Sequence, residues 1–163
     1  MKRFAFFSLL ALLLSCNKIE QPRFPAVGDS LPEFSVTTNK GILVNTQILS
    51  QGNSLIVFFN TLCKDCQQEL PVLQEFYNET SNDVRTILIS REEVNASIEK
   101  YWKENSLTLP YSPQESREVF NLFSNVGIPL CVLSKNGIII KVYNQYLDKT
   151  MPSLQELKKD FGL

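Results

Sequence analysis

A continuous apolar run at residues 55–59, with the sequence LIVFF, is the feature that most constrains the fold. Side chains of a strand point alternately to its two faces, so a run without polar residues predicts a strand that is buried on both faces. Other elements must then cover both sides of the sheet. A helix is expected next, because Leu70, Leu73 and Phe76 recur at the spacing of one helix face. We therefore expect this strand to lead into a helix that begins near Cys63.

Strands and helices alternate along the rest of the chain. In order, the patterns predict a hairpin over residues 34–44, a strand over 84–90, a helix that buries Val94 and Trp102, an extended piece over 107–111, a helix near 116–124, a hairpin over 130–143 and a C-terminal helix over 151–161 with Pro152 in its first turn. This order indicates an α/β fold, in which helices flank a central mixed β-sheet and the first hairpin is an N-terminal extension.

The chain of 163 residues contains four cysteines and no histidine. Ser-His-Asp and Cys-His nucleophile pairs and His-ligated zinc or haem are therefore excluded within this chain. Cys63 and Cys66 fall at the predicted junction of strand and helix. Unpaired N–H groups and the helix dipole stabilise an anion at that place, which favours the Cys63 thiolate. Cys66 lies one turn further on the same face, close enough to form a disulfide with Cys63.

Two other interpretations of the cysteine pair stay open. A purely structural disulfide would close a very small loop and would constrain the unfolded chain little. A zinc site would need two more ligands, and only Cys131 and a carboxylate remain for that purpose. Cys131 lies on an apolar strand two residues after Pro129, where a small buried side chain is the simpler expectation. We therefore expect neither a metal nor a cofactor.

The N-terminus has the pattern of an export signal. Lys2 and Arg3 precede an apolar run over residues 4–14, which is too short to span a bilayer. The segment ends in Leu-Leu-Ser-Cys16, which resembles the lipobox of bacterial lipoproteins, although a conventional secretory signal is the alternative. We expect a signal peptide over residues 1–15, a lipidated Cys16 with a tether over 16–25, and one domain over 26–163. The domain would then be anchored by lipid in the bacterial cell envelope, on the periplasmic or extracytoplasmic side.

Several separated motifs together resemble the TlpA-like and ResA-like thioredoxins of the bacterial envelope. They are Val27-Gly28-Asp29 and residues 32–36 in the first hairpin, residues 55–60, Cys63-x-x-Cys66 and Glu69-Leu70-Pro71 around the predicted active site, and Val126-Gly127-Ile128-Pro129 with residues 130–133 later in the chain. The resemblance covers about residues 27–143. It implies a thioredoxin-like fold and a cis peptide bond between Ile128 and Pro129, beside the Cys63 sulfur.

The resemblance also implies the roles of the site residues. Cys63 would attack a substrate disulfide, Cys66 would resolve the mixed disulfide, and Glu69 would accept the proton of Cys66. The substrate would bind beside Ile128, Pro129, Lys64 and Leu62. The sequence departs from the family pattern at Leu62, where many relatives have tryptophan, and at Asp65, where they often have proline. The buried acid of thioredoxin falls here on Val57, which leaves Glu69 as the candidate proton acceptor.

We expect a lipid-anchored thiol–disulfide oxidoreductase that reduces disulfides in cell-envelope proteins. Its partners would be those proteins and an upstream dithiol electron donor. We expect a monomer. The net charge of −1 does not favour nucleic-acid binding. A peroxiredoxin-like thiol peroxidase is the enzymatic alternative, but Thr61 lies two residues before Cys63 and not three, as the peroxidase motif requires. The non-enzymatic alternative is a partner-binding lipoprotein with a structural cysteine pair.

Overall fold

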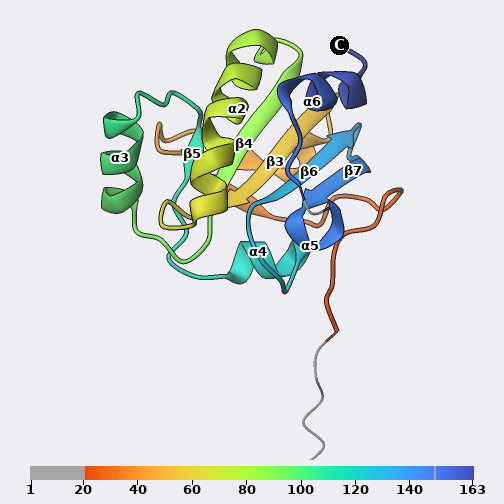
Figure 1. Ribbon diagram of the computed structural model, residues 1–163. Helices are drawn as coiled ribbons and strands as arrows, with labels where there is room; N and C mark the ends of the chain where they lie inside the picture. Colours follow the sequence, from red (N-terminus) through yellow and green to blue (C-terminus); the bar gives the residue numbers. More distant parts are fainter. Residues whose placement is uncertain (1–20, 149) are drawn as a thin grey trace, which may run out of the picture.

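The computed structural model describes residues 21–148 and 150–163, which fold around a five-stranded sheet with the strand order β5-β4-β3-β6-β7 (Figure 1). β4 is parallel to its neighbours β3 and β5, whereas β6 is antiparallel to both β3 and β7, so the sheet is mixed, as the sequence predicts. The apolar run lies in the central strand β3. The strands are β3 (Asn53–Phe59), β4 (Val84–Ser90), β5 (Tyr111–Ser112), β6 (Leu130–Lys135) and β7 (Ile138–Asn144).

Helices α2 (Lys64–Thr80), α3 (Asn95–Glu104) and α6 (Leu154–Phe161) cover one face of the sheet. Leu55, Val57 and Phe59 of β3 point into this layer and are almost fully buried. The ring of Phe59 packs against Trp102 of α3, with 5.1 Å between the ring centroids. The apolar stripe of α2 is thus buried on the sheet, which fixes the position of the N-terminus of α2 beside the end of β3.

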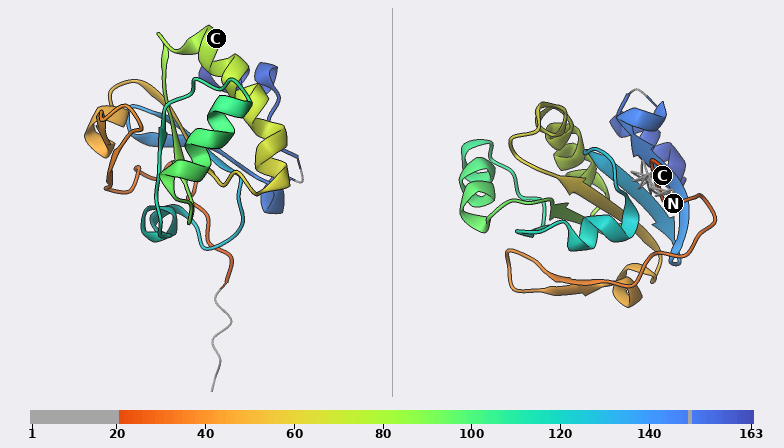
Figure 2. Two further views of the ribbon diagram at one scale, coloured as in Figure 1. Left: turned by 90° about the vertical axis from the view of Figure 1, so that its left-hand side faces the viewer. Right: turned by 90° about the horizontal axis from the view of Figure 1, so that it is seen from below.

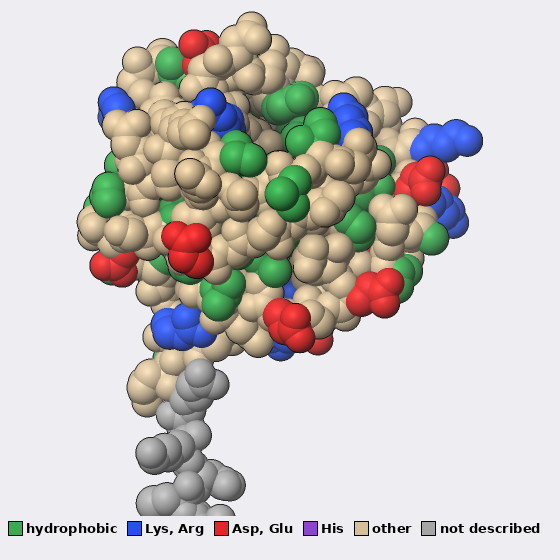
Figure 3. Space-filling view, turned by 180° about the vertical axis from the view of Figure 1, so that it is seen from behind, with side chains coloured by type: hydrophobic (Ala, Val, Ile, Leu, Met, Phe, Trp, Pro, Cys, Tyr) green, Lys and Arg blue, Asp and Glu red, His purple; other side chains and the backbone are tan. Residues whose placement is uncertain are grey.

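A hairpin and two short helices cover the other face of the sheet, as Figure 2 shows. Ile56 and Phe58 of β3 point to this side, and Phe58 contacts the ring of Phe123 at a centroid distance of 4.9 Å. Figure 3 shows this side of the molecule, on which hydrophobic side chains lie among scattered acidic and basic ones. The elements are β1 (Ser35–Thr37), β2 (Leu43–Asn45), α1 (Thr46–Leu49) and α4 (Glu118–Phe123). The strand that is buried on both faces is therefore confirmed.

Some predicted boundaries were wrong. The C-terminal helix begins at Leu154, because the Ser153 side chain caps it and forms a capping box with Glu156; Pro152 therefore precedes the helix. Val94 is 46% exposed at the N-cap of α3 and does not belong to the buried face of that helix. The short helix α5 (Gln145–Asp148) has no strong periodic pattern and was not predicted.

The predicted signal peptide and Cys16 lie outside the described residues, as does the first half of the predicted tether, residues 16–20. The last tether residues contact the domain, because the Arg23 N–H donates to Asn125 Oδ1 at 2.8 Å and the Ser124 hydroxyl donates to the Arg23 carbonyl at 2.9 Å. In residues 21–148 and 150–163, no helix has the length and apolar character needed to cross a membrane.

Candidate active site

Cys63 is the N-cap residue of α2, at the end of the buried strand. Its Sγ accepts the backbone N–H of Cys66 at 3.5 Å, and its side chain is partly exposed. The sulfur thus lies where the unpaired N–H groups of the helix point, and where a negative charge is stabilised. Both cysteines are thiols in this structure. The structure therefore places a partly exposed sulfur at the N-terminus of a helix.

Cys66 is fully buried one helical turn after Cys63. Burial raises the pKa of the Cys66 thiol far above its usual range, and the hydrogen bond with Cys63 acts in the same direction. The two sulfurs therefore differ in exposure, although they belong to one pair, and burial opposes ionisation of Cys66. This asymmetry is what a pair with one attacking and one resolving thiol requires.

Glu69 lies one turn after Cys66 on the same helix and is only 5% exposed. Burial raises its pKa from 4.5 to about 7, so a large fraction of this carboxyl is protonated at neutral pH. Its Oε1 has no hydrogen-bond partner among residues 21–148 and 150–163. Glu69 also lines a cavity of about 290 Å³ together with Asp65 and Met151, which offers space for water beside the carboxyl. The structure thus places a buried carboxyl, whose pKa burial raises, one helical turn from the buried Cys66.

The segment before β6 lies beside the Cys63 sulfur. The peptide bond between Ile128 and Pro129 is cis, as the resemblance implied, and the Cys63 thiol donates to the Ile128 carbonyl oxygen at 3.6 Å. The Asn144 side-chain amide donates to the carbonyls of Gly127 and Pro129 at 2.9 and 2.8 Å, which holds this segment against β7. The backbone of residues 127–129 is therefore fixed within reach of the reactive sulfur.

A cavity of about 390 Å³ opens beside Cys63. Ile128 and Arg91 line it, and Tyr146 of α5 forms part of its wall while remaining 72% exposed. Leu62, directly before Cys63, is 85% exposed. Of the four residues predicted to bind substrate, Ile128 lines this cavity, whereas Leu62, Pro129 and the exposed Lys64 do not belong to its lining. The surface around the sulfur is therefore partly apolar and open to a large ligand.

Sequence reasoning missed Glu93, which anchors the loop before Cys63. Its carboxylate accepts the Thr61 backbone N–H at 2.8 Å and also the Thr61 hydroxyl, although Glu93 is 7% exposed. Gln67 of α2 donates to the Thr61 carbonyl at 2.7 Å. These bonds fix the loop between β3 and α2. A glutamate after β4 carries no sequence signal for this contact, because the pairing depends on the parallel neighbours β3 and β4.

Cys131 is fully buried on β6, opposite Val57 of β3. Burial raises the pKa of this thiol well above its usual range, and the nearby Glu69 charge raises it further. This environment fits the packing role predicted from the sequence and disfavours a nucleophile at this position. Within the described ranges, no three His, Cys, Asp or Glu side chains form a group that could hold a metal ion.

Comparisons with known proteins agree with this geometry. The family model of the AhpC/TSA family matches residues 27–142. The thiol-disulfide oxidoreductase ResA of Bacillus thuringiensis subsp. konkukian is 21% identical over 94% of each chain. The sporulation thiol-disulfide oxidoreductase A of Bacillus subtilis is 29% identical over 75% of this chain and 73% of that protein.

Solved structures show the same fold. The crystal structure of StoA from Bacillus subtilis superposes with a TM-score of 0.67 at 24% identity, covering 81% of this chain and 98% of that one. A thiol:disulfide interchange protein of the thioredoxin family from Chlorobium tepidum superposes with a TM-score of 0.70 at 18% identity, covering 85% and 97%. The chain therefore has a thioredoxin-like fold and belongs to the AhpC/TSA family.

Proposed function

We propose that this protein is a thiol–disulfide oxidoreductase that reduces disulfides in cell-envelope proteins, with Cys63 as the attacking and Cys66 as the resolving thiol. One observation carries the proposal. A partly exposed Cys63 sulfur at a helix N-terminus accepts the N–H of a fully buried Cys66, and the backbone of Ile128 lies 3.6 Å away on the other side. The names of the relatives support the same chemistry.

The first step would form a mixed disulfide. The Cys63 thiolate attacks one sulfur of the substrate disulfide; a new bond joins Cys63 to that sulfur, and the other substrate sulfur leaves as a thiolate. Ionisation of Cys63 removes the S–H that donates to the Ile128 carbonyl. That oxygen can then accept an N–H from an extended substrate, which would align the substrate disulfide with Cys63. In this proposal Ile128 and Pro129 position the substrate backbone, and Leu62 and Lys64 contact its side chains.

The second step would release the reduced substrate. Cys66 loses its proton to Glu69, attacks the Cys63 sulfur and expels the second substrate thiolate, which leaves a disulfide between Cys63 and Cys66. Two electrons pass from the protein to the substrate. A base is needed because burial opposes ionisation of Cys66, and Glu69 is suited to the task since its pKa of about 7 leaves part of it ionised at neutral pH.

The cycle requires an upstream dithiol that reduces the Cys63–Cys66 disulfide again. The proposal further places the protein in the cell envelope, held to the membrane by a lipid on Cys16, with the domain acting as a monomer. Export supports persistent disulfides in its substrates. Growth with a radiolabelled fatty acid tests the anchor: label should appear on the wild type and be lost in Cys16→Ser. A wild-type protein without label would overturn the lipid anchor and leave the exchange chemistry in place.

Insulin reduction with dithiothreitol as electron donor tests the activity. We expect turnover by the wild type and its loss in Cys63→Ser, because no other exposed cysteine is available in the described chain. Glu69→Gln should slow exchange more than tenfold at neutral pH, while Glu75→Gln, on the exposed side of α2, should leave it unchanged. Peroxide consumption faster than insulin reduction would favour a thiol peroxidase, and the absence of both would favour a binding protein.

A further inference from the structure

Helix α5 lies at the same end of the sheet as Cys63, although it has no part in the proposed exchange steps. β3 and β7 are both antiparallel to β6, so they run in the same direction. Cys63 follows the end of β3 and α5 follows the end of β7, which places both at one end of the sheet (Figure 1). Gln145 and Tyr146 of α5 line the cavity beside Cys63. A ligand that reaches the Cys63 sulfur therefore meets this helix.

The ring of Tyr146 lies against the backbone of Gly127. A Cβ atom added at Gly127 would lie 2.7 Å from Tyr146 Cε2, which is well inside van der Waals contact. The φ of Gly127 is not positive, so the ring, and not the backbone conformation, leaves no room for a side chain here. The glycine thus lets an aromatic ring pack directly on the segment that carries Ile128.

One buried side chain holds both Tyr146 and this segment. Asn144 is 1% exposed, and its Oδ1 accepts the backbone N–H of Tyr146 at 3.0 Å. Its amide nitrogen donates to the carbonyls of Gly127 and Pro129 at 2.9 and 2.8 Å. Tyr146 is therefore positioned relative to the Ile128 carbonyl before any substrate binds, which lowers the ordering cost of binding.

Large apolar side chains are exposed around the Cys63 sulfur. Tyr146 is 72% exposed, and Leu62, directly before Cys63, is 85% exposed. Ile128 is half-buried and lines the same cavity as Tyr146. One face of the Tyr146 ring is packed on Gly127, so the other face is free to bury apolar surface of a ligand, which is favourable.

The charged side chains of the cavity do not favour an acidic ligand. The guanidinium of Arg91 lies over the ring of Phe120, 5.3 Å from its centroid. It also donates to the Val126 carbonyl at 3.5 Å, and its Nε lies 3.8 Å from the Glu92 carboxylate. Asp65, in the first turn of α2, adds a negative charge to the lining. The cation is thus already engaged, an acidic group would meet Asp65, and an uncharged side chain fits better.

From these observations we propose that Tyr146 is a substrate-specificity residue, whose exposed ring face packs against a large apolar side chain next to the attacked cysteine of a disulfide-bonded polypeptide. The inference rests on the proposed function and adds a substrate class to it. When Cys63 bonds to the substrate sulfur and the Ile128 carbonyl holds the substrate backbone, a neighbouring side chain enters the cavity of about 390 Å³ that Tyr146 lines. The preference therefore concerns the binding of substrate more than the chemical step.

Three disulfide-linked peptide dimers test the proposal. Each half is a blocked pentapeptide with a central cysteine that is flanked on both sides by leucine, serine or glutamate. The reduced full-length protein is mixed with each dimer over a range of concentrations, quenched with N-ethylmaleimide and analysed by mass spectrometry. Rates of the same dimers with dithiothreitol correct for their intrinsic reactivity. We expect the wild type to prefer leucine over serine at least about tenfold, equivalent to about 1.4 kcal/mol, and not to prefer glutamate over serine.

Three variants test whether the Tyr146 ring causes the preference. Tyr146→Ser should reduce it to about twofold or less by raising the half-saturating concentration of the leucine dimer. Tyr146→Phe keeps the ring and should retain the preference. Gly127→Ala should also reduce it, because the added methyl group displaces the ring. In the Tyr146→Ser background, Gly127→Ala should have no further effect on the preference.

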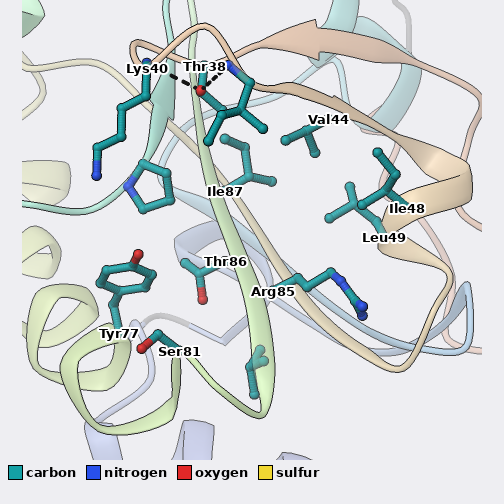
Figure 4. Close-up of a pocket in the computed structure, with 13 residues that line it drawn as sticks. Thr38, Lys40, Val44, Ile48, Leu49, Tyr77, Ser81, Arg85, Thr86 and Ile87 are labelled. Atoms are coloured by element: carbon teal, nitrogen blue, oxygen red, sulfur yellow. Dashed lines mark hydrogen bonds between the residues drawn. The ribbon is translucent and has the colours of Figure 1, made fainter.

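Two exposed apolar side chains outside the cavity serve as controls. Leu147→Ser changes the next residue of α5, which is 47% exposed and does not line the cavity. Ile48→Ser changes a side chain that is 36% exposed in a separate cavity of about 260 Å³, between α2 and the first hairpin (Figure 4). That cavity lies at the N-terminal end of β4, away from Cys63. Neither change should alter the preference.

The outcomes separate this inference from the proposed function. Equal rates for the leucine and serine dimers, a preference that survives Tyr146→Ser, or an equal loss in Leu147→Ser would each overturn the role of Tyr146 and leave the exchange chemistry in place. A loss in Gly127→Ala that is the same with and without the ring would also overturn it. Failure of the wild type to react with any dimer would overturn the proposed function as well.

Discussion

Replacing Glu69 by glutamine should change how the stability of the protein depends on pH. Burial raises the pKa of Glu69 from 4.5 to about 7. The difference between these values, at about 1.36 kcal/mol per unit, gives about 3 kcal/mol as the free energy needed to ionise this carboxyl in the folded state rather than in the unfolded state. Glu69 is 5% exposed, so solvent screens little of this effect.

The sign of the effect follows from proton binding. Below pH 4.5 Glu69 is protonated in both states and has no influence on the pH dependence. As the pH rises from about 4.5 to 7, the unfolded chain loses this proton first, so unfolding becomes more favourable. Above pH 7 the full loss of about 3 kcal/mol is present. Glu69→Gln has no such titration, so its stability relative to the wild type should rise by about 3 kcal/mol across this window.

Urea unfolding of the reduced proteins at a series of pH values measures this difference. At each pH, the free energy of unfolding of the wild type is subtracted from that of the variant. We then follow how this difference changes with pH, because the fixed effect of burying an amide and the titration of other groups cancel. Glu75→Gln, on the exposed side of the same helix, is the matched control and should give a flat difference. A flat difference for Glu69→Gln as well would refute the argument that burial makes this carboxyl a base near neutral pH.

Three other predictions concern residues around the site and the C-terminal helix. In the native reduced protein, iodoacetamide should label Cys63 at least tenfold faster than Cys131, which is fully buried. Mass spectrometry of the labelled peptides measures the two rates. Rapid labelling of Cys131 would contradict its burial. Glu93→Gln should destabilise the protein by about 2 kcal/mol in urea unfolding, because it weakens two hydrogen bonds from Thr61. A change below about 0.5 kcal/mol, which is typical of an ordinary surface substitution, would argue that Glu93 does not hold the loop before Cys63. Ser153→Ala should lower stability by about 1 kcal/mol through loss of the α6 cap, and Ser97→Ala, at an exposed site within α3, serves as the control.

The elements that dominate the fold could be predicted because their side chains repeat with a clear period. The run at residues 55–59 required burial on both faces, and the structure confirms it with one set of side chains packed on α2 and the other on α4. Ends of elements were less certain. The start of α6 depends on the capping box of Ser153 and Glu156, which competes with Pro152 as a start signal.

Contacts between elements that are distant in the sequence could not be predicted. Glu93 meets Thr61 only because β3 and β4 are parallel neighbours, and no local pattern reports that pairing. By contrast, Cys63, Cys66 and Glu69 lie on one helix, so their spacing alone predicted that they would be close together.

Trapping the mixed disulfide tests the central claim most directly. Cys66→Ser is mixed with a peptide that contains one disulfide, and the products are analysed by intact mass and peptide mapping without reduction. We expect one covalent adduct, linked to Cys63, that accumulates because no resolving thiol remains, whereas the wild type releases reduced peptide. A failure of Cys66→Ser to form an adduct, or an adduct on Cys131, would contradict the assignment of Cys63 as the attacking thiol.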